Sequence, residues 1–263
     1  MRADALLIPF DWEAAPAGVR VAVTQRRGGV SLGPHAALNL GDHVGDDPLA
    51  VTRNRALLME TLGLKQVPQW LRQVHGTGVV DARADGVVRE GDAAWTDRPG
   101  LACAVLTADC LPVVLAAADG REVAVAHCGW RGLASGVLQA SVARFSVPPG
   151  SLRAWLGPAI GPAAFEVGED VRRAFLDAGT DGVRPAVEAA FVPVPAAPGK
   201  FRADLYALAR TCLSALGVDE VEGGGRCTFA ENDLFFSYRR DGVTGRMATL
   251  AWIDPAQRNP QPT

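Results

Sequence analysis

The first 63 residues show two patterns of apolar positions: a short apolar run, which predicts a strand, and apolar residues at helical intervals, which predict a helix. Residues 21–25 have the apolar run of a short strand, after which a polar, Gly-rich loop follows. Pro48 comes directly after an Asp pair that can cap a helix, and Gly63 stands where that helix would end. Between these two positions apolar residues recur at helical intervals, so we expect one amphipathic helix there.

Beyond residue 70, short apolar runs are broken by Gly, Asp and Pro, which is typical of buried strands joined by turns. These runs predict strands at 71–74, 101–106, 111–116, 123–126, 152–156 and 247–253. Segments with helical spacing predict helices at 132–145, 169–178 and 203–216. Strands and helices are mixed without strict alternation, so the sequence indicates an α/β or α+β domain with a mixed sheet.

The length of 263 residues suits one domain, or two closely merged halves. We expect a single domain over 1–263, with 192–199 as a possible internal joint and a flexible, Pro-rich tail at 254–263. No window reaches the roughly 18 uninterrupted apolar residues of a membrane-spanning helix. The first residues do not resemble a signal peptide, and the expected location is therefore cytoplasmic.

Charge and cysteine content narrow the functional classes. The net charge of −3 gives no basic footprint for nucleic acid or for an anionic membrane. Five cysteines form an odd set in a chain without an export signal, so a disulfide framework is not expected. Each cysteine is taken as buried packing unless its surroundings indicate chemistry.

Three segments combine chemically active residues with glycine. His75 lies in the sequence Gln-Val-His-Gly at 73–76, and His127 begins the sequence His-Cys-Gly-Trp-Arg-Gly. Between them, Cys110 ends a short polar interruption of an apolar stretch. Glycines at strand ends let the backbone approach a ligand closely, and polar groups between buried strands need partners. Clustering of the three segments would satisfy both conditions.

Two imidazoles and a thiolate are well matched to Zn²⁺, and three protein ligands leave one tetrahedral position open, as in catalytic zinc sites. Such a site can acidify a bound water or polarise a substrate oxygen. The spacing of His75, Cys110 and His127 matches no metal signature, so satisfied core histidines and a buried cysteine remain the alternative. Cys128 is assigned to packing, because neighbours on a strand point to opposite faces.

The motifs together resemble the family first known as multicopper polyphenol oxidases or laccases and typified by bacterial YfiH. The resemblance covers nearly the whole chain in one order, and the combination is specific although no single piece is. It rests on Gly33-Pro34, Asn39-Leu40-Gly41, Asn54-Arg55, residues 73–76, 107–110, 127–132, 157–161 and 235–242, and Thr244-Gly245-Arg246-Met247.

This resemblance implies a layered α/β/β/α fold shared with the catalytic domain of cytotoxic necrotising factor toxins. It implies a metal bound by His75, Cys110 and His127, with Zn²⁺ as the expected cofactor and copper as the older family label. The implied substrates are purine nucleosides and phosphate: phosphorolysis of adenosine, inosine, guanosine and methylthioadenosine, with adenosine deamination besides. The family is also associated with editing of peptidoglycan precursors.

Four residues are candidate substrate contacts. Arg131, between Trp130 and a glycine, offers a planar fork of donors for phosphate, although a structural ion pair would also explain it. Gln73 should share the face of His75 on an extended strand and reach the base or a metal-bound water. Asn39 could bond a ribose hydroxyl if its loop covers the cleft. Arg239 adjoins a turn and could meet the substrate, a solvated charged turn being the alternative.

Other roles near Cys110 remain open. The neighbouring Asp109 could orient a histidine or simply cap a turn. Without metal, Cys110 could act as a nucleophile with His127 as base, which would make the protein a Cys–His hydrolase for an amide or a cell-wall precursor. A laccase-like copper oxidase is disfavoured, because four histidines do not supply several imidazole-rich copper centres. A non-enzymatic binding protein is the remaining alternative.

Overall fold

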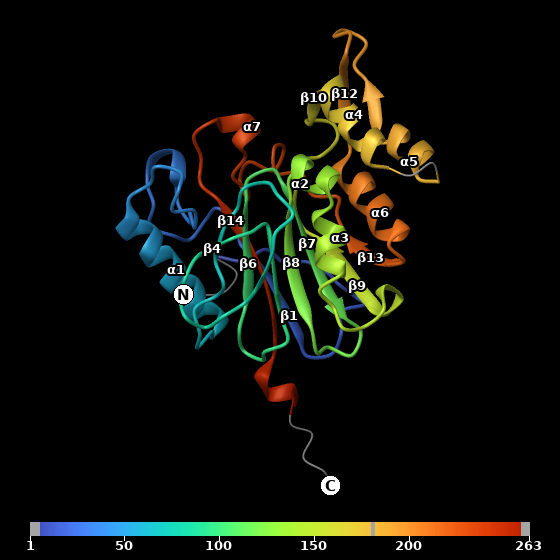
Figure 1. The fold of residues 1–263 in the computed structure, drawn as a ribbon. Coiled ribbons are helices and arrows are strands. Elements are labelled where there is room, and N and C mark those ends of the chain that lie inside the picture. The colour runs from blue at the N-terminus through green and yellow to red at the C-terminus, as the bar shows by residue number, and fades with distance from the viewer. Residues whose placement is uncertain (1–5, 180–181, 259–263) are drawn as a thin grey trace.

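The computed structural model describes residues 6–179 and 182–258 and consists of two stacked sheets with helices on both outer sides (Figure 1). The larger sheet is mixed and has the strand order β13-β9-β7-β8-β5-β3. Its strands span, in that order, Glu220–Gly223, Leu152–Leu156, Leu111–Ala117, Val123–Cys128, Ala93–Thr96 and Val79–Asp81. The central strands β7 and β8 are buried along their whole length. They therefore read as continuous apolar runs in the sequence.

The second sheet is antiparallel, with the order β1-β14-β6. Its strands are Val19–Val23, Met247–Ile253 and Cys103–Thr107. Alternate residues of β7 divide between two cores: Val114 packs toward this second sheet, whereas Val113 and Leu115 pack toward the helices. The space between the two sheets is thus one hydrophobic core, and the outer face of the larger sheet contributes to another.

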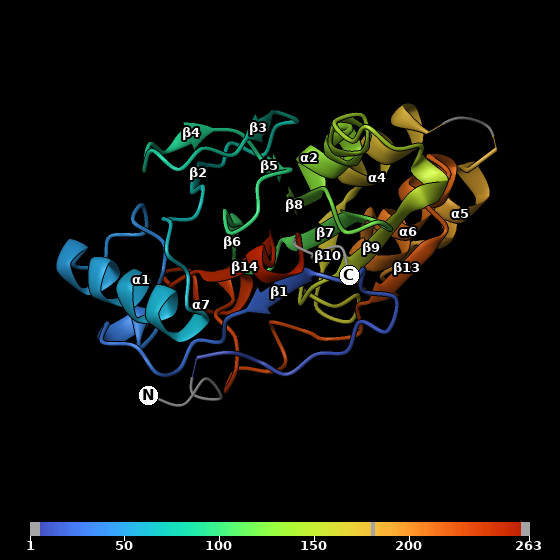
Figure 2. The ribbon, with the colours of Figure 1, turned by 90° about the horizontal axis from the view of Figure 1, so that it is seen from below.

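Helices cover the outer face of each sheet. Leu58 of α1 (Pro48–Leu62) packs with Ala104 of β6 and Leu250 of β14 in a third apolar cluster. The other main helices are α2 (Trp130–Ser135), α3 (Val137–Val142), α4 (Glu169–Ala178), α5 (Arg184–Ala189) and α6 (Leu205–Ala215). They lie on the side opposite α1, where two of them, α2 and α3, pack on β8 of the larger sheet and the others pack on these two and on one another (Figure 2). The order of layers is α/β/β/α, which confirms the predicted fold class.

Helix α1 begins and ends where the sequence predicts. The Asp47 side chain accepts a hydrogen bond from the Leu49 amide at 2.9 Å, and Gly63 closes the helix with φ 65°. Asn54 was not expected on the apolar face, yet it is fully buried. Its side-chain amide donates to the carbonyls of Ala37 and Asn39, and so ties the helix to the early Gly-rich loop.

The predicted helix at 132–145 is two shorter helices. Gly136 has φ 101° and stands between α2 and α3, so the chain bends at that position. A left-handed backbone costs glycine little, which explains why the break falls there. Helix α2 also begins earlier than expected, directly after Gly129, and this places its start beside the candidate residues His75 and Cys110.

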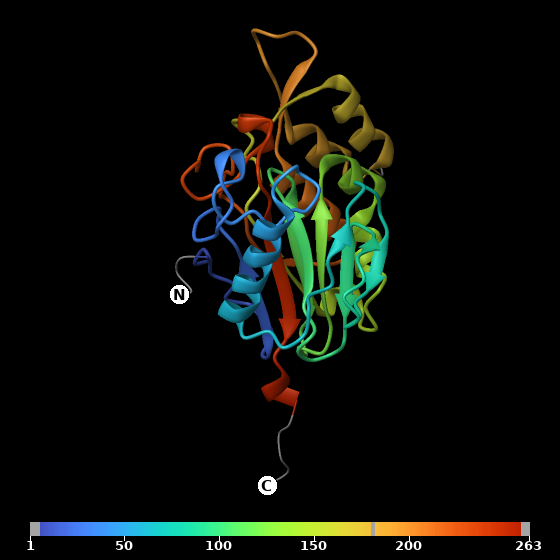
Figure 3. The ribbon, with the colours of Figure 1, turned by 90° about the vertical axis from the view of Figure 1, so that its left-hand side faces the viewer.

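Several short elements were not predicted, because their apolar runs are too brief. The strands β10, β12 and β11 (Glu166–Gly168, Lys200–Ala203 and Phe191–Pro193) form a small antiparallel sheet. The possible joint at 192–199 falls in its β11–β12 hairpin, which projects at the top of Figure 3. The other unpredicted elements are β4 (Arg89–Glu90), α7 (Tyr238–Asp241) and 3-10 turns at Gly33–His35, Pro149–Ser151 and Pro255–Arg258. The strand predicted at 71–74 is present but shorter, as β2 (Leu71–Arg72).

The chain ends beyond the second sheet. Residues 255–258 of the predicted tail form the last 3-10 turn, and residues 259–263 lie outside the described residues. Among the helices that the structure describes, none combines the length and the apolar character needed to cross a bilayer.

Candidate metal centre

His75, Cys110 and His127 converge at one end of the sheets. Their ligand atoms all lie within 4.8 Å of one another. The Cys110 Sγ is 3.8 Å from His75 Nε2, and the two imidazole rings meet edge to face with centroids 4.8 Å apart. His127 is buried, Cys110 is half-buried and His75 is exposed. The cluster is therefore anchored in the protein on one side and open to solvent on the other.

Strand pairing explains why residues distant in sequence meet here. In the antiparallel pair β7–β8, Leu111 lies opposite Cys128 and Pro112 opposite His127. Cys110 directly precedes β7, so it comes beside the end of β8. Cys128 is fully buried in the core under the helices, as predicted from strand alternation, and burial raises its pKa well above the ordinary value.

One buried carboxylate holds both histidines. The Asp92 side chain accepts hydrogen bonds from three consecutive amides, those of Val74, His75 and Gly76, at 3.2, 2.9 and 2.7 Å. Its Oδ1 also lies 2.8 Å from His127 Nδ1. With Nδ1 facing Asp92, the Nε2 of His127 is directed toward the cluster, which is the arrangement found around metal-binding histidines. Asp92 thus orients one histidine through its ring and the other through its backbone.

Asp92 was not among the residues singled out in the sequence, where Asp109 was the candidate either for this orienting role or for capping a turn. Asp109 instead accepts from the Thr228 hydroxyl at 2.6 Å and from the Arg239 amide at 2.7 Å, so it joins the β6–β7 connection to α7. The only mark of Asp92 in the sequence is that an acidic residue stands between Gly91 and the apolar strand β5. A fully buried carboxylate needs several hydrogen bonds, and here it receives them from the two histidine segments.

The backbone is strained where the cluster forms. His75 and Asp109 have φ 60° and 93°, and the structure shows no other described non-glycine residue at positive φ. Such conformations cost on the order of 1 kcal/mol or more and persist where surrounding bonds enforce them. The Asp92 carboxylate supplies such bonds at His75, because all three amides of that turn point to it.

Glycines in the motif after His127 allow the close approach. A Cβ on Gly129 would lie 2.6 Å from His75 Cδ2 and 3.1 Å from Cys110 Sγ. A Cβ on Gly132 would lie 2.9 Å from the Gly76 carbonyl oxygen. Neither position has room for a side chain, so α2 can begin against the His75 turn only with glycine at both.

The electrostatics of the cluster favour a thiolate. Burial alone would raise the pKa of Cys110, but the His127 and His75 imidazoles outweigh it and lower the pKa to about 6. Burial would lower the pKa of His127, yet the Cys110 sulfur and the Asp92 carboxylate raise it to about 9. Without metal, the pair therefore exists as thiolate and imidazolium at neutral pH.

This charge state predicts selective alkylation of the metal-free protein. Iodoacetamide should modify Cys110 at a rate that rises with pH around pH 6, because the thiolate is the reacting form and its pKa is lowered. Cys103 and Cys128, which are fully buried, should not react. Peptide mass spectrometry over pH 5–9 measures both rates. A Cys110 rate that rises only above pH 8 would contradict the proposed charge state.

The donor set fits a metal ion. Two imidazole nitrogens and one sulfur within mutual reach are the donors that zinc and copper accept, and Asp92 supplies the carboxylate behind a ligating histidine. The other two histidines do not join them: His35 bonds the Val44 carbonyl and His43 lies beside Asp42. Among the described residues this is the single cluster of three or more such side chains that could hold an ion.

Two predicted substrate contacts are structural instead. Asn39 is fully buried, and its amide bonds Gly41, Asp46 and the Arg246 backbone, which leaves nothing for a ribose hydroxyl. Gln73 directs its amide oxygen and nitrogen to the backbone of Leu106, at 2.7 and 2.8 Å. It therefore extends the edge of β6 and supports the loop that carries His75.

The two predicted arginines lie in the first turns of short helices. Arg131 is exposed and stacks on the Trp130 ring at 4.4 Å, without an ion-pair partner among the described residues. Arg239 is exposed, donates to the Glu166 carbonyl and lies over the Phe165 ring. Arg246, in the last motif of the resemblance, received no role from the sequence. Burial lowers the pKa of Arg246, and the largest influence in the opposite direction is the nearby charge of Cys110.

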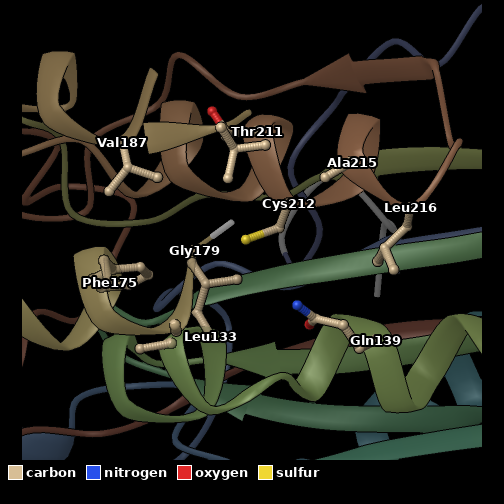
Figure 4. A pocket seen from close by; sticks show the side chains of 12 residues that line it. Leu133, Gln139, Phe175, Gly179, Val187, Thr211, Cys212, Ala215 and Leu216 are labelled. Carbon is tan, nitrogen blue, oxygen red and sulfur yellow. The ribbon is translucent and has the colours of Figure 1, made fainter. Parts of the chain in front are cut away.

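A separate cavity of about 230 Å³ lies between α2, α3 and the helices α4 to α6 (Figure 4). Leu133, Phe175 and Val187 form its apolar wall, and Cys212 points toward its centre. Burial raises the pKa of Cys212 to about 11, so this thiol is protonated at neutral pH. None of the three cluster residues lines this cavity.

Several known proteins are similar to this chain in sequence and fold. A family model described as multi-copper polyphenol oxidoreductase laccase matches residues 20–254. Purine nucleoside phosphorylase PA4543 of Pseudomonas aeruginosa is 53% identical over 250 residues, covering 95% of this chain and 99% of the relative. Purine nucleoside phosphorylase YfiH of Escherichia coli is 47% identical, with 94% and 98% covered. The crystal structure of Neisseria meningitidis NMB0706, of family DUF152, is 51% identical with TM-score 0.87, covering 94% of this chain and 99% of that one.

Fold and site define a class of layered α/β/β/α proteins with a His–Cys–His cluster at the ends of the central strands. The chain belongs to the multi-copper polyphenol oxidoreductase laccase family, the family of bacterial YfiH. The resemblance stated from the sequence motifs is thereby confirmed.

Proposed function

We propose that this protein is a metal-dependent purine nucleoside phosphorylase that uses adenosine, inosine, guanosine and methylthioadenosine, with adenosine deaminase activity at the same site. The observation that carries the proposal is the solvent-open cluster of His75, Cys110 and His127, held from behind by Asp92. Relatives that match almost the whole chain bear the name purine nucleoside phosphorylase, which supports the reaction class. We place the enzyme in the cytoplasm, where its five unpaired thiols would stay reduced.

His75, Cys110 and His127 would hold the ion, which we propose to be Zn²⁺. When bound, such an ion supplies an electrophilic centre for an oxygen of phosphate or water. The protein contributes the rest. Asp92 fixes the ring of His127 and the turn of His75, so that neither ligand must be ordered during the reaction. Cys110 is already a thiolate at neutral pH, since its pKa is about 6.

The partial exposure of the cluster defines the direction of approach. His75 is exposed while His127 is buried, so a nucleoside and phosphate would enter from the His75 side. On the protein side, the buried carboxylate of Asp92 accepts from Nδ1 of His127 and so leaves the Nε2 of that ring directed toward the ion. Alignment of two substrates in one open site accounts for catalysis mainly by positioning and by charge stabilisation.

A Cys–His hydrolase is the second candidate, and one observation favours it. The paired charge state of Cys110 and His127 is that of an activated nucleophile and its base. The two functions differ in metal content, because a nucleophilic Cys110 must be free of metal. A copper oxidase has less support: two of the four histidines lie apart from the cluster, so several imidazole-rich copper centres are not available.

Metal content and phosphate dependence test the proposal together. Protein purified without added metal should contain about one zinc per chain by inductively coupled plasma mass spectrometry. It should release hypoxanthine from inosine only when inorganic phosphate is present, and chelation should abolish this release. Re-addition of Zn²⁺ should restore it. Metal-free protein that hydrolyses amides and ignores inosine would instead support the Cys–His hydrolase.

A further inference from the structure

We infer that Arg246 binds the inorganic phosphate of the reaction, with the free edge of its guanidinium facing the His75–Cys110–His127 cluster. This inference rests on the proposed function and gives it a phosphate site. The sequence instead favoured Arg131 for this role. Arg246 directly precedes β14, and its hydrogen bonds hold one edge of the guanidinium.

Strand register brings Arg246 to the cluster. In the antiparallel pair β14–β6, Met247 lies opposite Thr107. Arg246 directly precedes Met247, so the same register sets it beside Ala108, two residues before Cys110. Its backbone is fixed there, because the Arg246 amide donates to the Asn39 side chain at 2.9 Å. The arginine therefore projects from the sheet end at which the cluster forms.

The guanidinium is held on one edge and free on the other. Its Nη1 donates to the carbonyls of Thr244 and Gly245, both at 3.0 Å. Its side-chain stem packs over Gly41, where an added Cβ would lie 2.8 Å from the Arg246 Cγ, and its head lies over the Tyr238 ring. Neither Nε nor Nη2 has an acceptor among the described residues. This Nε–Nη2 edge is the fork that binds oxyanions through two parallel hydrogen bonds.

Charge also favours an anion at this position. Arg246 is half-buried, and no carboxylate lies within ion-pair distance of it among the residues that the structure describes. Other half-buried arginines of the same region differ: Arg55 pairs with Asp42, and Arg240 pairs with Asp241. Asp109 is close enough to act on Arg246 electrostatically, but Thr228 and the Arg239 amide already occupy both of its oxygens. An unpaired, partly desolvated guanidinium is a strong binder of a divalent anion.

The test compares four variants, Arg246→Gln, Arg246→Lys, Arg26→Gln and Arg131→Gln, by isothermal titration calorimetry with inorganic phosphate and by steady-state kinetics with inosine. Arg246→Gln should raise the phosphate Kd and the phosphate KM by about 10- to 100-fold, because a charge-assisted pair of hydrogen bonds is lost. The KM for inosine should change less than 3-fold. Arg246→Lys restores the charge without the fork and should recover part of the phosphate affinity.

Arg26→Gln is the matched control. Arg26 is also half-buried, stacks on the Phe236 ring and donates to two backbone carbonyls, yet it has no charge interaction with Cys110. It should leave phosphate affinity unchanged. The zinc content and the thermal unfolding midpoint are measured for every variant. Values equal to those of the wild type exclude a general loss of the site.

Each outcome separates the inference from the proposed function. Wild-type protein without phosphate-dependent turnover would overturn the proposed function itself. Wild-type turnover with an unchanged phosphate KM in Arg246→Gln would overturn the role of Arg246 and leave the function standing. A phosphate KM that rises in Arg131→Gln alone would assign the phosphate to Arg131. If Arg246→Gln is unstable, the partial phosphate affinity of Arg246→Lys decides, and full wild-type affinity in that variant would contradict recognition by the fork.

Discussion

Replacing Cys110 with alanine is expected to remove the metal and to abolish nucleoside turnover, while the far-UV circular dichroism spectrum stays unchanged. The substitution deletes the one sulfur donor and leaves two imidazoles, which hold zinc far less tightly. Cys110 belongs to none of the three hydrophobic cores, so the fold should persist. Metal analysis and phosphate-dependent hypoxanthine release from inosine measure the two losses.

Cys212→Ala is the control for this experiment. Cys212 is a partly buried thiol in the separate cavity, which none of the cluster residues lines. It should retain one zinc per chain and full turnover. Activity that survives in the Cys110→Ala variant would show that the cluster is not the catalytic site.

Replacing Asp92 with asparagine should weaken metal binding by about 10- to 100-fold, as loss of a carboxylate behind a metal ligand commonly does. Asparagine has only one acceptor oxygen. Its NH₂ group must therefore face N–H donors, either those of the His75 turn or that of His127, and cannot accept from them. Breaking this buried pair should also lower the free energy of unfolding by about 3–5 kcal/mol. Competition with a chromophoric zinc chelator and urea denaturation measure the two effects.

Asp81→Asn, on the neighbouring strand β3, provides the matched control. Asp81 is exposed and pairs with Arg144, so its loss should cost less than about 1 kcal/mol and leave metal affinity unchanged. Equal zinc affinity in the Asp92→Asn variant and wild type would refute the orienting role of Asp92.

The sequence was sufficient wherever local signals determine structure. Helix α1 follows its capping Asp47, its first-turn Pro48 and its left-handed Gly63, all of which act within a few residues. Strand β14 matches its prediction because it is an uninterrupted apolar run in a covered sheet. The short strands β10 to β13 escaped prediction, since they have few apolar residues and depend on pairing with distant partners.

The sequence predicted only part of the site, for a similar reason. His75, Cys110 and His127 stand out by residue type and by neighbouring glycines, and Cys128 is separated from them by strand alternation. Asp92 has no such mark, because its partners are brought to it only when β5 pairs with β8. Asn39 resembled a substrate contact because it lies in a Gly-rich loop. This loop is buried, however, so its backbone groups need hydrogen-bond partners, and the Asn39 side chain bonds the amide and the carbonyl of Gly41.

The single carboxylate behind both histidines has a consequence for metal uptake. The bonds that join Asp92 to the His75 turn and to β8 involve no ion, so they would keep the proposed coordinating geometry preorganised, and loading would cost little conformational entropy. Uptake should then resemble ligand binding to a rigid receptor, unlike the coupled folding of a zinc finger. The metal-free protein would then stay folded, and the fraction of chains that hold an ion would depend on the concentration of free ions in the cell.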